Sequence, residues 1–310
     1  MKAEVIPMTA ISRRTFVGGS LAAVAALRYR RAFAGGGEPD VVDVQGSDPH
    51  KMIAALLATL GGIGKFVKKG DFVVIKPNAA FANPPEWGTT THPQTVVALA
   101  KACLDAKAKG VMILEFPQAK AEVCLKRCGL TDAMSALPAV KIKLLSSPGD
   151  FQKVEVKGGV SLKSTDVAKA LLSADVFINV AAAKAHNQSA VSLGLKNHMG
   201  LIYDRQIFHT GLDLHQAIAD LGRAISPKLT IVDGTRALLT NGPAGPGETA
   251  TPGRIVGGRQ IASVDAYALT LAKFNNKALT PADVRHIELA GKVGLGEVDI
   301  AKLKVKKVSA

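Results

Sequence analysis

The sequence predicts an α/β fold, with a mostly parallel sheet flanked by helices. Runs rich in β-branched residues alternate along the chain with segments whose apolar residues recur at helical spacing. Because the strand-like runs are apolar at nearly every position, both faces of each strand are expected to be buried, as in parallel sheets. With 310 residues, 47% of them hydrophobic, the chain is long enough for one large domain or for two α/β lobes, and both arrangements stay open.

The alternation begins after residue 40. The elements expected in the first half are strand Val41–Val44, helix Pro49–Leu60, strand Phe72–Lys76, helix Pro93–Ala108, strand Val111–Leu114 and helix Ala119–Arg127. Two further runs, Val140–Leu145 and Lys153–Val156, predict a short strand pair, that is, a small β-hairpin, and Gly158-Gly159 follows the second run. We expect this hairpin to be an insertion or to lie at the edge of the sheet.

The second half continues the same alternation. Its expected elements are helix Thr165–Leu172, strand Val176–Val180, helix Leu212–Ile225, strand Leu229–Val232, strand Arg254–Val256, helix Ile261–Lys273 and a closing strand around Leu303–Val305. Two long polar or Gly/Pro-rich stretches, 181–209 and 233–253, follow predicted strands. In open α/β sheets, ligands bind at the carboxyl ends of the strands, so these stretches are the places to expect a site.

The first 34 residues resemble a twin-arginine export signal. An arginine pair at 13–14 precedes an apolar run, Val17–Leu27, and residues 32–34 read Ala-Phe-Ala, the small-x-small pattern that signal peptidases cleave. At about 1.5 Å per helical residue this run is too short for a hydrocarbon core of about 30 Å, so no stable membrane span is expected. We expect the twin-arginine translocase to export the chain to the periplasm, with residues 35–310 as the mature domain; cleavage itself stays open.

The charge and the cysteines limit the classes of partner. The formal net charge is +14, and +9 without the first 34 residues, which carry six Lys/Arg and one Glu. This surplus favours small anionic molecules. Aromatic residues make up 5% of the chain and are not interleaved with the basic ones, so nucleic acid is not expected. Cys103, Cys124 and Cys128 are too few for the four thiolates of an iron–sulfur cluster, so none is expected. We predict that they pack in the interior or stay unpaired, with a metal site or a strained disulfide at Cys124 and Cys128 as the alternative.

One group of candidate site residues follows the predicted strand Phe72–Lys76. It contains two basic or amide side chains, two hydroxyls and an imidazole: Lys76, Asn78, Thr90, Thr91 and His92. Together with the backbone N–H groups at the start of the helix that begins at Pro93, these residues predict a seat for an anion. Helix capping and loop rigidity are the alternative explanation for the same pattern.

The densest polar cluster follows the predicted strand Val176–Val180. It holds two Lys-x-His units, Lys184-Ala185-His186 and Lys196-Asn197-His198. A desolvated lysine can bind an anion or act as a base, and imidazole can transfer protons or ligate a metal. We therefore expect catalytic roles for both units, with His186 and His198 as the candidate ligands of a metal ion. The identity and presence of such a metal stay open.

Two acids are expected at the same rim of the sheet. Asp233 follows the predicted strand Leu229–Val232, and Asp265 lies among apolar residues in the next predicted helix. Each is expected to orient or pair with the basic residues, with helix capping as the alternative for Asp265.

Seven blocks of the sequence resemble the family catalogued as domain of unknown function 362 (DUF362). The blocks are Val74–Asn78, Thr90–Pro93, Ala174–Val180, Lys184–His186, Leu195–Gly200, Asp233-Gly234 with Gly242-Pro243, and Gly294–Glu297. The resemblance implies no established reaction. Some relatives carry attached ferredoxin-like iron–sulfur modules, which hints at redox work, but the four-cysteine runs of such modules are absent from this sequence. Relatives typically have Lys-Thr-His where this chain has Lys184-Ala185-His186.

Together these features predict an exported enzyme that acts on a small anionic substrate in a cleft lined by lysine and histidine. Redox chemistry and metal or acid–base chemistry are its two versions. The expected catalytic residues are His92, Lys184, His186, Lys196 and His198. The expected substrate-binding residues are Lys76, Asn78, Thr90, Thr91, Asn197, Asp233 and Asp265. The alternative is a periplasmic metal- or anion-binding or maturation protein without turnover, and a third interpretation is an envelope protein without a small-molecule site.

Overall fold

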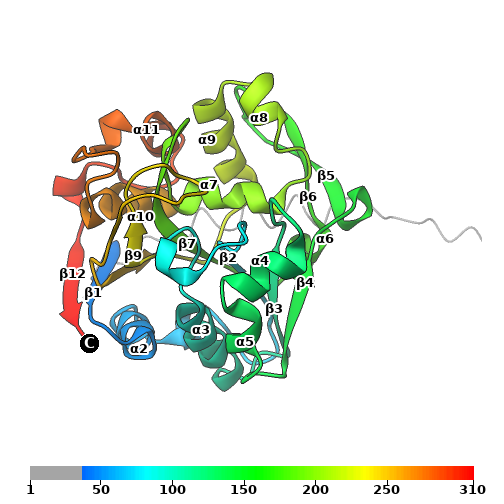
Figure 1. Cartoon of the computed structure of the whole chain (residues 1–310), viewed down its shortest axis with the longest axis vertical. Helices are drawn as coiled ribbons and strands as arrows, with labels where there is room; N and C mark the ends of the chain where they lie inside the picture. The colour runs from blue at the N-terminus through cyan, green and yellow to red at the C-terminus, as the bar shows by residue number, and fades with distance from the viewer. Residues whose placement is uncertain (1–36) are drawn as a thin grey trace, which may run out of the picture. The chain divides into compact units, whose positions relative to one another are not determined.

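A ten-stranded sheet runs through residues 37–310, the part of the chain that the computed structural model describes (Figure 1). Its strands are β1 (Val41–Gln45), β2 (Phe72–Pro77), β3 (Gly110–Glu115), β4 (Val140–Leu144), β7 (Val176–His186), β8 (Ala190–Ser192), β9 (Leu229–Leu238), β10 (Thr249–Ala250), β11 (Arg254–Gly258) and β12 (Val305–Ser309). The main order is β12-β1-β11-β9-β7-β2-β3-β4, with β8 beside β7 and β10 beside β9. Along this main order every pair is parallel except the two that involve β11.

Helices cover both faces of the sheet (Figure 1). One face packs against α2 (Pro49–Thr59), α3 (Pro93–Asp105), α4 (Ala121–Arg127) and α5 (Leu130–Met134). The other packs against α7 (Gly194–Asn197), α9 (Leu214–Ala224), α10 (Ile261–Ala268) and α11 (Arg285–Lys292). Successive strand residues alternate between the two cores: Val73 and Ile75 belong to the first, and Val74 to the second. This burial on both faces explains the continuous apolar character of the central strands.

The predicted fold class is therefore confirmed, and residues 39–310 form one compact unit rather than two lobes. The expected export signal lies outside the described residues. Among residues 37–310, no helix combines the length and the apolar character that crossing a bilayer requires.

The predicted hairpin is wrong in its pairing. Val140–Leu144 is β4, which lies at the edge of the main sheet and pairs in parallel with β3. The second run is β5 (Phe151–Glu155), whose antiparallel partner is β6 (Ser164–Ala168). A helix was expected over Thr165–Leu172, but β6 occupies its first half and only one turn, α6 (Lys169–Leu172), is helical. The Gly158-Gly159 turn thus joins β5 to the strand that follows it, not to the one before.

Two strands are longer than predicted, and their extra length positions the site. β7 continues six residues past Val180 to His186, and β9 continues past Val232 to Leu238. Short strands that follow in the sequence pair with both extensions: β8 pairs with the end of β7, and β10 pairs with the end of β9. Lys184, His186 and Asp233 therefore lie within strands, where backbone pairing fixes them, and not in loops.

Candidate functional site

A cavity of about 850 Å³ opens at the carboxyl ends of β2, β3 and β7. Segments far apart in sequence form its wall, and four of the residues that line it are basic side chains: Lys76, Lys184, Lys196 and Arg205. Lys76 comes from β2, Lys184 from β7 and Lys196 from α7. The structure thus brings the three predicted lysines into one cavity, as the sequence analysis expected. Asn78, His186 and Asn197 line it as well.

Lys76 is paired with an acid inside the cavity wall. Its Nζ lies 2.8 and 2.9 Å from the two carboxylate oxygens of Glu115, 3.1 Å from Asn197 Oδ1 and 2.5 Å from the carbonyl oxygen of Pro77. Glu115 also accepts hydrogen bonds from the backbone N–H groups of Ala79 and Phe116, at 2.7 and 2.9 Å. Burial lowers the pKa of Lys76 and Glu115 opposes this shift. Four acceptors, two of them carboxylate oxygens, match an ammonium ion.

Lys184 is as deeply buried as Lys76 but has no acidic partner among the described residues. Its Nζ donates to Asn78 Oδ1 at 3.1 Å and to the carbonyl oxygen of Thr89 at 2.5 Å. The ring of Phe81 lies beside it, with its centroid 4.7 Å from Nζ. Burial lowers the pKa of Lys184 to about 7, and the charge of Lys76 contributes.

Lys196 is the second buried lysine without a carboxylate partner in residues 37–310. The residue is 8% exposed, and its Nζ contacts the thioether sulfur of Met199 at 2.9 Å. Burial lowers the pKa of Lys196 to about 8, and the nearby guanidinium of Arg205 adds to the shift. A thioether is a weak acceptor, so this ammonium keeps most of its capacity to bind an anion.

His186 presents a hydrogen-bond donor and not a base. Its Nδ1 accepts from the backbone N–H groups of Gln188 and Ser189, at 3.1 and 3.3 Å. Burial, together with the charges of Lys196 and Lys184, lowers the pKa of His186 to about 2, so the ring is neutral. With Nδ1 acting as the acceptor, the single ring proton lies on Nε2. Because residues two apart on a strand share a face, His186 and Lys184 line the same cavity.

The expected anion seat at the start of α3 is a capping site. His92 is not among the residues that line the cavity: it is the N-cap of α3, where its Nδ1 accepts from the backbone N–H of Gln94 at 3.2 Å. Asp233 accepts from the backbone N–H of His92 at 3.0 Å and from the Thr95 hydroxyl at 2.8 Å. The alternative of helix capping therefore describes His92, and Asp233 anchors the same helix start.

The two predicted threonines also lie outside the cavity lining. The Thr91 hydroxyl accepts from the backbone N–H of Asn78 and donates to the carbonyl oxygen of Val180, both at 2.8 Å. Thr90 is buried, and its hydroxyl has no hydrogen-bond partner among residues 37–310. Thr91 thus supports the site indirectly, because it fixes the backbone of Asn78.

His198 and Asp265 are buried residues that do not line the cavity. His198 is fully buried against the ring of Phe177, with ring centroids 5.7 Å apart, and neither of its nitrogens has a hydrogen-bond partner in the described chain. Asp265 accepts from the backbone N–H groups of Gly194 and Leu195, at 2.7 and 2.8 Å. Burial raises the pKa of Asp265 to about 7. Its carboxyl group holds the start of α7, the turn that carries Lys196.

Among the lining residues that were not predicted, three contact or neutralise the basic side chains of the cavity or are themselves basic: Phe81, Glu115 and Arg205. Glu115 carried a usable signal, because it is a charged residue directly after an apolar strand. Arg205 carried none. Its guanidinium lies 4.0 Å from the centroid of the Phe116 ring and donates to the carbonyl oxygens of Phe116 and Pro117, at 2.8 and 3.3 Å.

The described residues contain no group of three His, Cys, Asp or Glu side chains that is arranged to hold a metal ion. Cys103, Cys124 and Cys128 are buried and free, which confirms that they pack in the interior. Burial raises the pKa of Cys103 to about 12 and that of Cys128 to about 11, so both are thiols at neutral pH.

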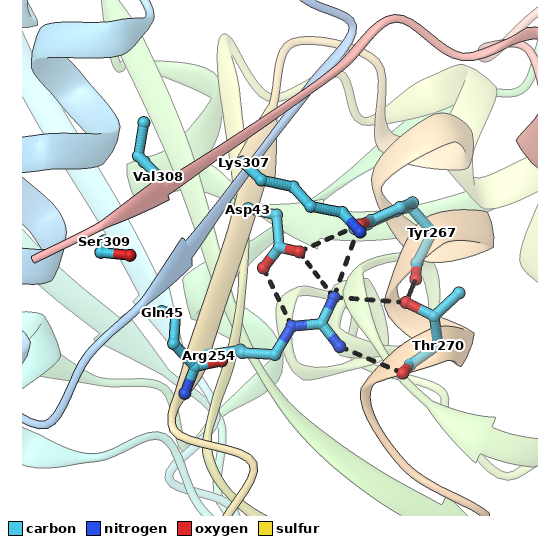
Figure 2. Close-up of a pocket in the computed structure, with 8 residues that line it drawn as sticks. All are labelled: Asp43, Gln45, Arg254, Tyr267, Thr270, Lys307, Val308 and Ser309. Carbon is cyan, nitrogen blue, oxygen red and sulfur yellow. Dashed lines mark hydrogen bonds and ion pairs between the residues drawn. The ribbon is translucent and has the colours of Figure 1, made fainter.

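A second pocket, of about 610 Å³, lies beside β1, β11 and β12 (Figure 2). Arg254 binds the Asp43 carboxylate there through Nε and Nη2, at 3.0 and 2.6 Å, and the Tyr267 hydroxyl donates to the same carboxylate at 2.9 Å. Arg254 Nη1 donates to the Thr270 carbonyl oxygen at 3.1 Å. The guanidinium of this pocket is therefore neutralised by an acid, unlike Lys184 and Lys196 in the larger cavity.

The fold and the site define an α/β protein with a cationic cavity at the carboxyl ends of parallel strands. The chain belongs to the family described as Domain of unknown function (DUF362), whose profile matches residues 73–270. It is 28% identical over 256 residues to the thylakoid-associated protein sll1697 of Synechocystis sp., a match that covers 78% of this chain and 74% of the relative.

A structure of the lactate racemase apoprotein from Thermoanaerobacterium thermosaccharolyticum matches 63% of this chain with a TM-score of 0.46 and 10% identity. The match spans about half of that chain, 51%.

Proposed function

We propose that this protein is an enzyme that binds a small anionic substrate in the cavity and uses Lys184 to transfer a proton. One observation carries the proposal: Lys184 and Lys196 are buried in the wall of an open cavity, and no carboxylate of the described chain pairs with either. An uncompensated buried charge costs several kcal/mol, and the cost falls when an anion supplies the missing partner.

The two lysines suit different roles. Lys196 has only a thioether as a contact for its ammonium group, so we assign it the anionic group of the substrate. Lys184 has a pKa of about 7, so its amine is present both with and without the extra proton near neutral pH. A group with such a pKa is an effective general acid or base. His186 supplies a neutral N–H donor through Nε2.

Proton transfer is proposed in place of metal ligation because of the donor atoms themselves. The Nδ1 lone pair of His186 accepts two backbone N–H groups, and His198 does not reach the cavity lining. The two histidines expected as metal ligands therefore do not direct nitrogen lone pairs at a common point in the cavity.

The anion site is tested by thermal unfolding in increasing sulfate at constant ionic strength. Sulfate stabilises most proteins without binding a site, so the informative quantity is the difference between variants. We expect the wild type to gain a saturable increase in Tm that Lys196→Met removes. The matched control is Lys101→Met, which removes the same charge from an exposed helix position. Equal sulfate dependence in all three proteins would contradict the proposal.

We further propose that residues 1–34 direct the folded chain to the twin-arginine translocase. The support is the arginine pair, the short apolar run and Ala-Phe-Ala in that order. In a bacterium with this pathway, replacing Arg13 and Arg14 by lysine should leave the full chain in the cytoplasmic fraction. Unchanged recovery from the periplasmic fraction would overturn this proposal and leave the cavity proposal untouched.

A further inference from the structure

The number of acceptors around each buried lysine distinguishes Lys184 from Lys76. An ammonium group has three N–H donors, whereas a neutral amine has two and a lone pair. Lys76 Nζ is surrounded by four oxygen acceptors, two of which belong to Glu115. Lys184 Nζ has two, Asn78 Oδ1 and the carbonyl oxygen of Thr89. Two acceptors are what a neutral amine can satisfy with both N–H groups while its lone pair stays free.

The cavity leaves room for a reactant at this amine. Lys184 is one of the residues that line the cavity, and Phe81, which flanks its Nζ at 4.7 Å, lines it too. Burial and the nearby charge of Lys76 favour the neutral form over the ammonium form, against the attraction of the Phe81 ring face for a cation. A lysine that is desolvated and close to another cation is activated as a nucleophile toward carbonyl carbon.

We propose that Lys184 is a nucleophile that forms an imine with the carbonyl carbon of a small oxo acid. The inference rests on the proposed function and deepens it: Lys196 binds the anionic group of that substrate, and the proton that Lys184 transfers goes to the carbonyl oxygen as the Lys184 nitrogen attacks the carbonyl carbon. The oxo-acid class follows from the two chemistries in one cavity: an ammonium free to bind a carboxylate and an amine free to attack a carbonyl.

The reaction is balanced without an oxidant or a reductant. The lone pair of Nζ attacks the carbonyl carbon, and one amine proton moves to the carbonyl oxygen to give a carbinolamine. The second amine proton and the hydroxyl group then leave as one water molecule, and a C=N bond forms. The product is a neutral imine without an N–H, and uptake of one proton from solvent gives the iminium, whose single N–H can donate to Asn78 Oδ1 or to the carbonyl oxygen of Thr89. Nε2–H of His186 is the neutral donor available to the departing oxygen.

The imine is tested by reductive trapping on the full-length protein. The purified protein is incubated with glyoxylate and sodium cyanoborohydride at pH 7.5, and the modified lysines are identified by peptide mass spectrometry. Hydride from the reductant converts the imine to a stable secondary amine. Because an exposed lysine has a pKa near 10.4, we expect Lys184 to be modified roughly a hundredfold faster than an exposed lysine. Sulfate should slow trapping at Lys184 alone.

The position of the adduct in the wild-type protein decides the test, so the test does not require any variant to fold. Lys184→Met should abolish the dominant adduct, and Lys101→Met should retain it. No adduct at Lys184, or modification spread over exposed lysines without preference, would overturn the imine. If sulfate still stabilises the protein through Lys196 in that case, anion binding stands and the nucleophile alone is wrong. If sulfate has no Lys196-dependent effect either, both proposals fail.

Discussion

His198 shows what burial does to a side chain that a sequence pattern assigns to catalysis. The ring is fully buried against Phe177, both nitrogens lack hydrogen-bond partners in the described chain, and burial lowers its pKa to about 3. An imidazole held neutral in the fold binds no proton where the unfolded chain already does. Between pH 6.5 and about 3, therefore, His198 makes the folded state less stable as the pH falls.

We predict that His198→Leu protects the protein against mild acid. Leucine fills a similar volume without unpaired nitrogens, so stability at pH 7 should not fall. On going from pH 7 to pH 5, the free energy of unfolding of the wild type should fall by about 2 kcal/mol more than that of the variant. The reason is that a histidine with a pKa of 6.5 binds a proton in the unfolded chain and thereby stabilises the unfolded state. Urea unfolding at the two pH values measures this difference. His50→Leu, at an exposed position on α2, is the control. A variant with the wild-type pH dependence would contradict the argument.

At this scale, the sequence predicts which residues are chemically unusual better than it predicts what they do. Lys184 and Lys196 stand out because charged residues interrupt small and apolar ones. His186 and His198 have the same local pattern, two residues after a lysine, yet only His186 lines the cavity. The difference depends on which face of β7 or of the α7 turn meets the cavity, and tertiary pairing sets that face. His92 follows the same principle, because a residue before Pro93 suits a helix cap and an anion seat equally well.

The short helical segment η5 (His198–Leu201) packs closely on the cavity wall because one of its residues, Gly200, has no side chain. A Cβ atom added at Gly200 would lie 2.6 Å from Glu115 Oε1, 2.6 Å from Lys76 Cε and 2.8 Å from Lys76 Nζ. Real Cβ atoms do not approach other atoms so closely. Glycine at this position therefore allows η5 to pack directly on the Lys76–Glu115 ion pair.

We predict that Gly200→Ala separates this ion pair and destabilises the fold. Separating a buried ion pair leaves two poorly compensated charges, so the loss should be about 3 kcal/mol or more. Gly64→Ala is the matched control, because a Cβ atom there meets nothing within 4 Å. Urea denaturation of both variants measures the difference in the free energy of unfolding. If the two substitutions cost the same, the close packing at Gly200 is not what the pair depends on.

The long strands β7 and β9 show why some elements were predicted too short. Residues 181–183 are three alanines, which have a low intrinsic preference for strands, and Asp233-Gly234 is a typical turn sequence. Both segments are strands because they pair with each other and with β8 or β10. The pairing between β7 and β9 joins residues about fifty positions apart and leaves no local signal. The central strands, by contrast, were predictable because burial on both faces makes each of them a continuous apolar run in the sequence.

In the whole molecule, the carboxyl ends of the parallel strands bring the charged side chains of the cavity together. Lys76, Glu115 and Lys184 come from three strands that are separate in the sequence but adjacent in the sheet order β7-β2-β3. The prediction of one shared cleft succeeded for the lysines because it relied on this property of α/β sheets and not on a local motif. It failed for His92 and Asp233, since those residues fasten α3 to β9 at the same rim.

The two proposed roles of the cavity have opposite pH dependence. Anion binding needs protonated lysines, whereas imine formation needs a neutral Lys184. With pKa values of about 7 for Lys184 and about 8 for Lys196, sulfate affinity should fall as the pH rises from 6 to 9. Trapping of glyoxylate at Lys184 should instead rise through pH 7 and decline once Lys196 loses its proton.

The measurement is a pair of pH series, one of sulfate-dependent Tm and one of the initial trapping rate at Lys184. Sulfate stays doubly charged over this range, so its own titration does not interfere. In Lys196→Met we expect trapping to lose its decline at high pH, because no second lysine then titrates, although its rate at the optimum is lower. An exposed lysine would show only a rise toward pH 10. A trapping rate at Lys184 that follows that exposed-lysine profile would mean that burial does not activate the amine, and the imine would be excluded.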